Sequence, residues 1–145
     1  MKYFIVVFAL FLSMFVLNAQ SIKETKVPEK VKTAFAGFYP DAQEIKWQKD
    51  KQGFVVNFKL ENIPASLLLN PEGKLLETKT SVPQSELPQN LQDYITANCK
   101  DYKLLNQEKI VNFDGTVIFK ISIIKKKLKK DLLFSNDGHL ITNNQ

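Results

Sequence analysis

The sequence predicts an α+β fold: two tandem helix-plus-four-strand repeats that form a joined, curved antiparallel sheet with both helices on one face. Two segments carry apolar residues at helical spacing, and each is followed by alternating apolar and polar residues broken by turn signals. The two halves also match when the sequence is slid along itself by about 60 residues, which indicates an internal duplication.

Amphipathic helices are expected at about 28 to 38 and about 87 to 98. Apolar residues recur every four positions, at Val27, Val31, Phe35 and Tyr39 in the first helix and at Leu87, Leu91, Ile95 and Cys99 in the second. Pro28 and Pro88 suit the first turn of a helix, where a missing N–H removes no intrahelical hydrogen bond.

Eight strands are expected from alternating or continuous apolar runs, at about 43 to 49, 53 to 61, 63 to 70, 74 to 80, 103 to 112, 115 to 124, 127 to 134 and 139 to 143. Gly73 and Gly138 follow turn-forming residues at matching positions of the two halves. Neither unit alone can bury the apolar stripe of its helix and the apolar face of its strands. We therefore expect the two units to cover one another and to leave the other face of the sheet more exposed to solvent.

The first 19 residues are typical of a cleaved signal peptide. Lys2 precedes an apolar run from Tyr3 to Leu17, and Ala19 offers a small residue before the cut. A retained membrane anchor is the alternative, but it needs about 20 apolar residues and this run is shorter. We therefore expect residues 20–145 to be one duplicated domain, with repeats at about 26–82 and 86–145, in the periplasm or secreted.

Charge and cysteine content narrow the classes of partner. All 20 basic residues are lysine, and the net charge falls only from +5 to +4 once Lys2 is removed. Proteins that read nucleic acids usually use arginine for bidentate contacts, so no nucleic-acid partner is expected. Cys99 is the only cysteine, so no internal disulfide can form.

Several motifs resemble those of the PepSY-like family of small exported bacterial proteins, also described as β-lactamase-inhibitor-like. They are Val27-Pro28-Glu29-Lys30-Val31, Ala34-Phe35, Tyr39-Pro40-Asp41-Ala42, Trp47 and the alternating strand from Phe54 to Phe58. The resemblance implies a curved sheet, a periplasmic location and a binding or inhibitory role. Asn98-Cys99-Lys100 replaces the corresponding Phe38-Tyr39-Pro40 in the second half, and the absence of disulfides separates the chain from the authentic inhibitor. Inhibition of a β-lactamase is therefore not expected.

No catalytic, cofactor-binding or metal-binding residue is predicted, and we expect no enzyme and no cofactor. His139, the only histidine, follows Asp137-Gly138 at a turn and matches Lys74 of the first half, so we expect a surface residue and not the oriented base of hydrolase chemistry. Cys99 closes a helix stripe and Trp47 alternates in phase with Ile45, so both are expected in the core. No spaced set of zinc ligands and no glycine-rich phosphate loop occurs.

Two surfaces remain as candidate sites. The uncovered sheet face is expected to present a polar, slightly basic set: Lys46, Gln48, Asn57, Lys59, Lys120 and Ser122, with Val55 among them. The second is a basic hairpin made of Lys125, Lys126, Lys127, Lys129 and Lys130. We favour a solvated turn that discourages edge-to-edge strand pairing, with contact to an anionic membrane or an acidic partner as the alternative.

The function that these features favour is a non-enzymatic periplasmic binding module that recognises a protein, peptide or envelope component. The alternative, implied by the PepSY resemblance, is an inhibitor or chaperone of a secreted peptidase. A hydrolase with an unfamiliar site is a third, less favoured hypothesis.

Overall fold

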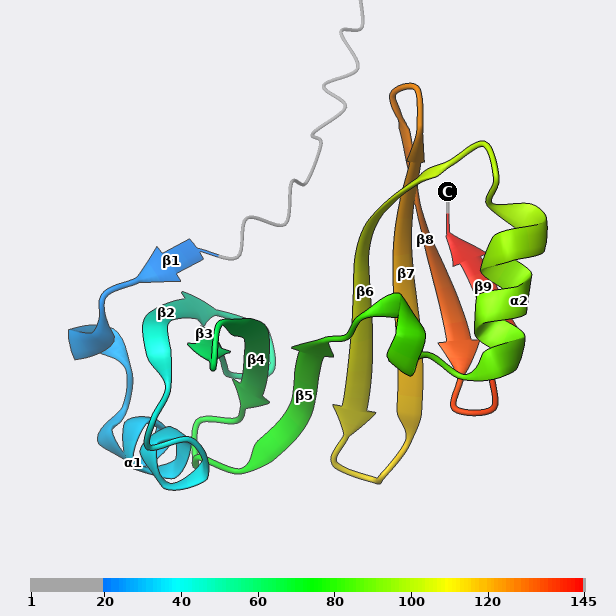
Figure 1. Ribbon diagram of the computed structural model, residues 1–145. Helices are drawn as coiled ribbons and strands as arrows, with labels where there is room; N and C mark the ends of the chain where they lie inside the picture. Colours follow the sequence, from blue (N-terminus) through cyan, green and yellow to red (C-terminus); the bar gives the residue numbers. More distant parts are fainter. Residues whose placement is uncertain (1–19, 145) are drawn as a thin grey trace, which may run out of the picture.

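The computed structural model describes residues 20–144, and the expected signal peptide lies outside them. Two helices accompany the strands of one antiparallel sheet (Figure 1). The strands are β1 Gln20–Ile22, β2 Gln43–Lys49, β3 Phe54–Leu60, β4 Ile63–Leu69, β5 Leu75–Ser81, β6 Lys103–Asn112, β7 Val117–Lys125, β8 Leu128–Ser135 and β9 Leu140–Asn144. They lie side by side in sequence order, so each strand pairs with its neighbours along the chain.

Helix α1 spans Glu29–Phe38 and helix α2 spans Gln89–Asn98, close to the predicted ranges. A short 3₁₀ turn precedes each one, at Glu24–Lys26 and Gln84–Glu86. Their apolar spacing places one stripe of each helix against the sheet, with the most deeply buried residues at Val31, Phe35, Leu91 and Ile95. No helix within residues 20–144 has the length and apolar character needed to cross a membrane.

The prediction of two tandem helix-plus-four-strand repeats with both helices on one face is wrong. The described chain forms a single nine-stranded sheet, and β1 at its edge was not predicted. Strands β5 and β6 pair without a break from Glu77 opposite Asn112 to Ser81 opposite Glu108. Figure 1 shows α1 and α2 near opposite ends of this sheet. Because neighbouring strands rotate by about 20° each, a sheet this wide does not offer the two helices one common layer.

The expectation that two units cover one another is also wrong, because each helix covers a cluster of its own. The α1 cluster comprises Val27, Val31, Phe35, Trp47, Phe54, Val56, Phe58, Leu67 and Leu69. The α2 cluster comprises Leu87, Leu91, Ile95, Cys99, Phe119, Ile121, Ile123, Leu132 and Phe134. A helix of 10 residues is about 15 Å long. That length matches the width of about three strands, so one helix suffices for each cluster.

Candidate functional site

The face of the sheet turned away from the two clusters is the candidate site, and we call it the open face. Val56 and Phe58 are buried in the α1 cluster, so Asn57 between them projects to the other side. The pairing register then places Lys46, Asn57, Ser66 and Lys79 in one row across β2 to β5. Neighbours in such a row share a face, so distant parts of the sequence contribute to one surface.

A polar hollow of about 220 Å³ lies on the open face. Its lining includes Asn57, Ser66, Lys79, Ser81 and Glu108. These residues come from the middle strands β3 to β6. The hollow therefore offers hydroxyl, amide, ammonium and carboxylate groups to a side chain that enters it.

A second hollow of about 280 Å³ lies near the turn between β6 and β7, and its walls are mixed, with Leu68 and Leu76 beside Glu77 and Asn112. Phe113 stands at its rim with 68% of its surface exposed. The backbone N–H of Phe113 donates a hydrogen bond to the Leu76 carbonyl at 2.9 Å, and Lys74 Nζ lies 5.4 Å from the ring centroid. An exposed aromatic ring held at its backbone is a typical anchor for a partner.

A network of charges continues the open face across β6 to β8. Lys120 Nζ lies 3.4 Å from Asp131 Oδ2 and 3.7 Å from Glu108 Oε2. Ser122 Oγ donates a hydrogen bond to Asp131 Oδ1 at 2.6 Å. Burial pushes the pKa of Asp131 upward, but the bond from Ser122 and the positive charge of Lys120 outweigh it, so this pKa lies below its usual value.

The structure brings some of the predicted face residues together and separates others. Lys46 and Asn57 lie directly opposite one another, and Gln48 lies opposite Val55. Lys59 Nζ forms an ion pair with Glu44 Oε1 at 2.8 Å, so its positive charge is already compensated. The other members lie at a distance, because β4, β5 and β6 intervene between β3 and β7.

Ser122 and Lys120 are less available than their polarity suggests. Ser122 is only 4% exposed, and Lys120 is half-buried within the charge network. Residues of the middle strands that line the polar hollow were missed: Ser66, Lys79, Ser81, Asn106 and Glu108. In β5 both alternating sets are polar around Thr78 and Lys79, so hydrophobic alternation could not assign its faces.

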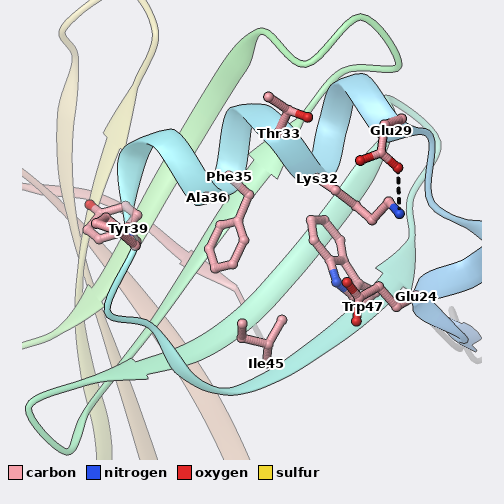
Figure 2. A pocket seen from close by; sticks show the side chains of 10 residues that line it. Glu24, Glu29, Lys32, Thr33, Phe35, Ala36, Tyr39, Ile45 and Trp47 are labelled. Carbon is pink, nitrogen blue, oxygen red and sulfur yellow. Dashed lines mark ion pairs between the residues drawn. The ribbon is translucent and has the colours of Figure 1, made fainter.

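A third hollow, of about 370 Å³, lies beside the core between α1 and β2 (Figure 2). Phe35 and Trp47 form its apolar floor, with ring centroids 5.5 Å apart, and Trp47 is in the core as expected. Glu24 and Glu29 stand at its rim, and Glu29 forms an ion pair of 2.7 Å with Lys32. Within residues 20–144, Trp47 Nε1 is the buried side-chain polar atom that lacks a hydrogen-bond partner.

The groups that could suggest catalysis do not form a catalytic arrangement. His139 Nδ1 lies 2.9 Å from Asp137 Oδ2, and Ser135 Oγ donates to the same carboxylate, so the hydroxyl does not meet the imidazole. Cys99 is buried, and burial raises the pKa of its thiol, which disfavours the reactive thiolate. Residues 20–144 contain no group of three or more side chains suited to hold a metal ion.

No protein-family model matches the sequence, and no curated protein matches it either. Among solved structures, a BLIP-like protein from Bacteroides fragilis matches with a TM-score of 0.66 at 20% identity, over 81% of this chain and 85% of that one. The fold is thus β-lactamase-inhibitor-like. The resemblance to the PepSY-like family stays a prediction.

Two further solved structures resemble this chain in fold. A candidate periplasmic protein from Bacteroides eggerthii matches with a TM-score of 0.76 at 20% identity, over 81% of this chain and 88% of that one. A DUF2874 family protein from Bacteroides uniformis matches with a TM-score of 0.73 at 17% identity, over the same shares. At these identities the likeness concerns the fold alone.

Proposed function

We propose that the protein is a non-enzymatic binding module of the periplasm that recognises a protein or peptide on its open face. The observation that carries the proposal is the pair of hollows on β3 to β6, one polar and one with mixed polar and apolar walls, neither of them lined by a helix of the described chain. The apolar leader pattern and the likeness to a candidate periplasmic protein support the location.

The size of the open face suits a protein partner. The six strands β2 to β7 have seven or more residues each. At a spacing of about 4.8 Å, seven residues of each strand span roughly 25 Å by 23 Å. That area of roughly 600 Å² approaches the roughly 800 Å² per partner of a standard protein–protein interface. A small metabolite would use only one of the hollows, whereas a protein loop can fill both.

The chemistry of the two hollows suggests how a partner is held. Phe113 offers an exposed ring for apolar contact, and such aromatic residues often dominate binding energy. Lys79 and Glu108 also line the polar hollow, and each is already in an ion pair, Lys79 with Glu77 at 2.9 Å and Glu108 with Lys120 at 3.7 Å. They can therefore orient a partner by sharing hydrogen bonds, not by offering unpaired charge. We therefore expect the partner to present an apolar side chain next to a polar or charged one.

Site-specific photo-cross-linking tests this proposal. A photoreactive amino acid is placed at Ser81, in the polar hollow, and for comparison at Thr96, which is exposed on α2. We expect one periplasmic protein to cross-link from position 81 but not from position 96, and to be lost when Phe113→Ala is added. Equal cross-linking from both positions would contradict the proposal. The alternative of a peptidase inhibitor uses the same face, and the identity of the cross-linked protein distinguishes the two.

A further inference from the structure

The hairpin between β7 and β8 extends beyond the neighbouring strands. Figure 1 shows its orange tip projecting past the end of β6. Lys125 lies opposite Leu128, so Lys126 and Lys127 form a two-residue turn at the tip. The basic hairpin predicted from the sequence is therefore placed at one extremity of the described molecule.

Positive charge at this tip is largely uncompensated. Lys125 Nζ is paired with Asp101 Oδ2 at 2.9 Å. Within the described residues, no ion pair involves Lys126, Lys127, Lys129 or Lys130. Lys126 and Lys127 are thus exposed without an ion pair at the turn, whereas the charge of Lys129 helps to lower the pKa of Asp131 and Lys130 is half-buried.

An apolar side chain stands among these charges. Leu128 is 55% exposed at the tip, although burial of a leucine is favourable. The backbone of Lys126 is left-handed, with φ of 56°, a conformation that favours glycine at the first position of a two-residue turn. Lysine therefore occupies a position where the backbone alone would select glycine.

Protection of a sheet edge accounts for only part of this pattern. Strand β7 is paired with β6 and β8 on its two sides, and β8 is paired with β9 from Asp131 to Phe134. The edge left at the tip is limited to residues 128–130, and so short an edge needs little protection.

We propose that this basic hairpin docks the protein peripherally on a membrane surface rich in anionic phospholipid. The lysines would lie at the level of the lipid phosphates, and Leu128 would enter the boundary between headgroups and acyl chains. Each lysine near an anionic surface strengthens partitioning about fivefold, and the attraction is screened by salt. The exposed leucine favours a lipid surface, because the boundary between headgroups and acyl chains offers it an apolar environment without a matching pocket on a partner.

Vesicle co-sedimentation tests the proposal with the exported protein purified from an expressing bacterium. The vesicles contain phosphatidylglycerol and phosphatidylcholine in equal parts, or phosphatidylcholine alone. The test variant combines Lys126→Gly with Lys127→Gln, which removes two tip charges and suits the left-handed turn. The matched control combines Lys26→Gln with Lys51→Gln, two exposed lysines outside the hairpin. All of these proteins share the same N-terminal residues, so any contribution of those residues to vesicle binding is equal and does not affect the comparison.

We expect the wild-type protein and the control to bind the mixed vesicles equally, and the tip variant to bind about 25-fold more weakly, or about fivefold for each lysine. Binding should disappear in phosphatidylcholine vesicles and in high salt. Equal binding by the two double variants would overturn the proposal, as would the absence of binding by the wild type. Retention on immobilised polyglutamate without binding to vesicles would also overturn it, in favour of an acidic protein. Circular dichroism confirms that each variant is folded.

Discussion

Ser122 on β7 and Asp131 on β8 face one another across a strand pair, and the Ser122 hydroxyl donates a 2.6 Å hydrogen bond to the Asp131 carboxylate. This bond joins a buried polar residue to the charge network on the open face. It therefore links the stability of the sheet to the surface that we propose as the binding site.

Replacement of Ser122 by alanine is expected to lower the free energy of unfolding by about 1 kcal/mol, since a hydrogen bond to a partly exposed carboxylate is lost. Ser66→Ala is the control, because Ser66 lies on the same face without this bond, and its effect should stay within about 0.5 kcal/mol. Urea unfolding followed by circular dichroism measures both. Equal effects of the two substitutions would show that the bond contributes nothing.

Acid should destabilise the protein partly through Asp131. The pKa of this group is lower in the folded protein than in the unfolded chain, so its contribution is present above the unfolded value of about 3.9. The contribution is lost as the pH falls through the lower, folded pKa. Unfolding measured from neutral to acidic pH should therefore show a smaller acid loss for Asp131→Asn than for the wild type. Parallel curves would contradict the lowered pKa.

Trp47→Phe is expected to change the free energy of unfolding by less than about 1 kcal/mol. The smaller phenylalanine ring makes fewer apolar contacts, which lowers stability. The substitution also removes the indole N–H, and a buried N–H without a partner destabilises the folded protein by about 1–3 kcal/mol. Phe35→Ala removes the neighbouring ring without that compensation and should cost about 3–5 kcal/mol. If Trp47→Phe proved as damaging as Phe35→Ala, the indole N–H would have to be hydrogen-bonded in solution.

Substitution of two glycines with nearly the same backbone φ distinguishes the cost of a steric clash from the cost of backbone strain. Gly73 and Gly115 have φ of 83° and 85°, and a Cβ at Gly73 would lie 2.8 Å from the Lys30 carbonyl of α1, whereas nothing lies within 4 Å at Gly115. Gly115→Ala should cost only the left-handed strain of about 1–2 kcal/mol. Gly73→Ala should cost clearly more, because α1 must move away from the β4–β5 turn. Thermal unfolding of the pair measures the difference, and similar melting temperatures would contradict the packing of α1 on that turn.

Periodicity explains which parts of the fold were predictable. Regular spacing of Val31 and Phe35, and of Leu91 and Ile95, was enough to place both helices. Strand β1 was missed because three residues are too few to show the alternation of apolar and polar residues that is typical of a strand, and they directly follow the apolar leader. The predicted architecture was wrong for a different reason: the spacing shows which residues are apolar, but not which strands each helix packs against, and those contacts divide the core into two clusters.

The candidate site was predictable only in part. Strong alternation in β3 and β7 assigned Asn57, Lys120 and Ser122 to the side away from the helices. The burial of Ser122 depends on Asp131, a partner on the next strand that local pattern does not reveal. Strand β5 shows no apolar alternation beyond Leu76, so Lys79 and the polar hollow emerged only from the pairing register.

The affinity of the cross-linked partner for hollow-blocking variants tests the central claim most directly. Ser81→Trp fills the polar hollow on the open face, and Thr96→Trp adds a bulky ring to the exposed surface of α2. We expect the dissociation constant of the partner to rise at least about tenfold, or about 1.4 kcal/mol, for Ser81→Trp and to stay unchanged for Thr96→Trp. An unchanged dissociation constant for a folded Ser81→Trp variant would contradict recognition through the open face.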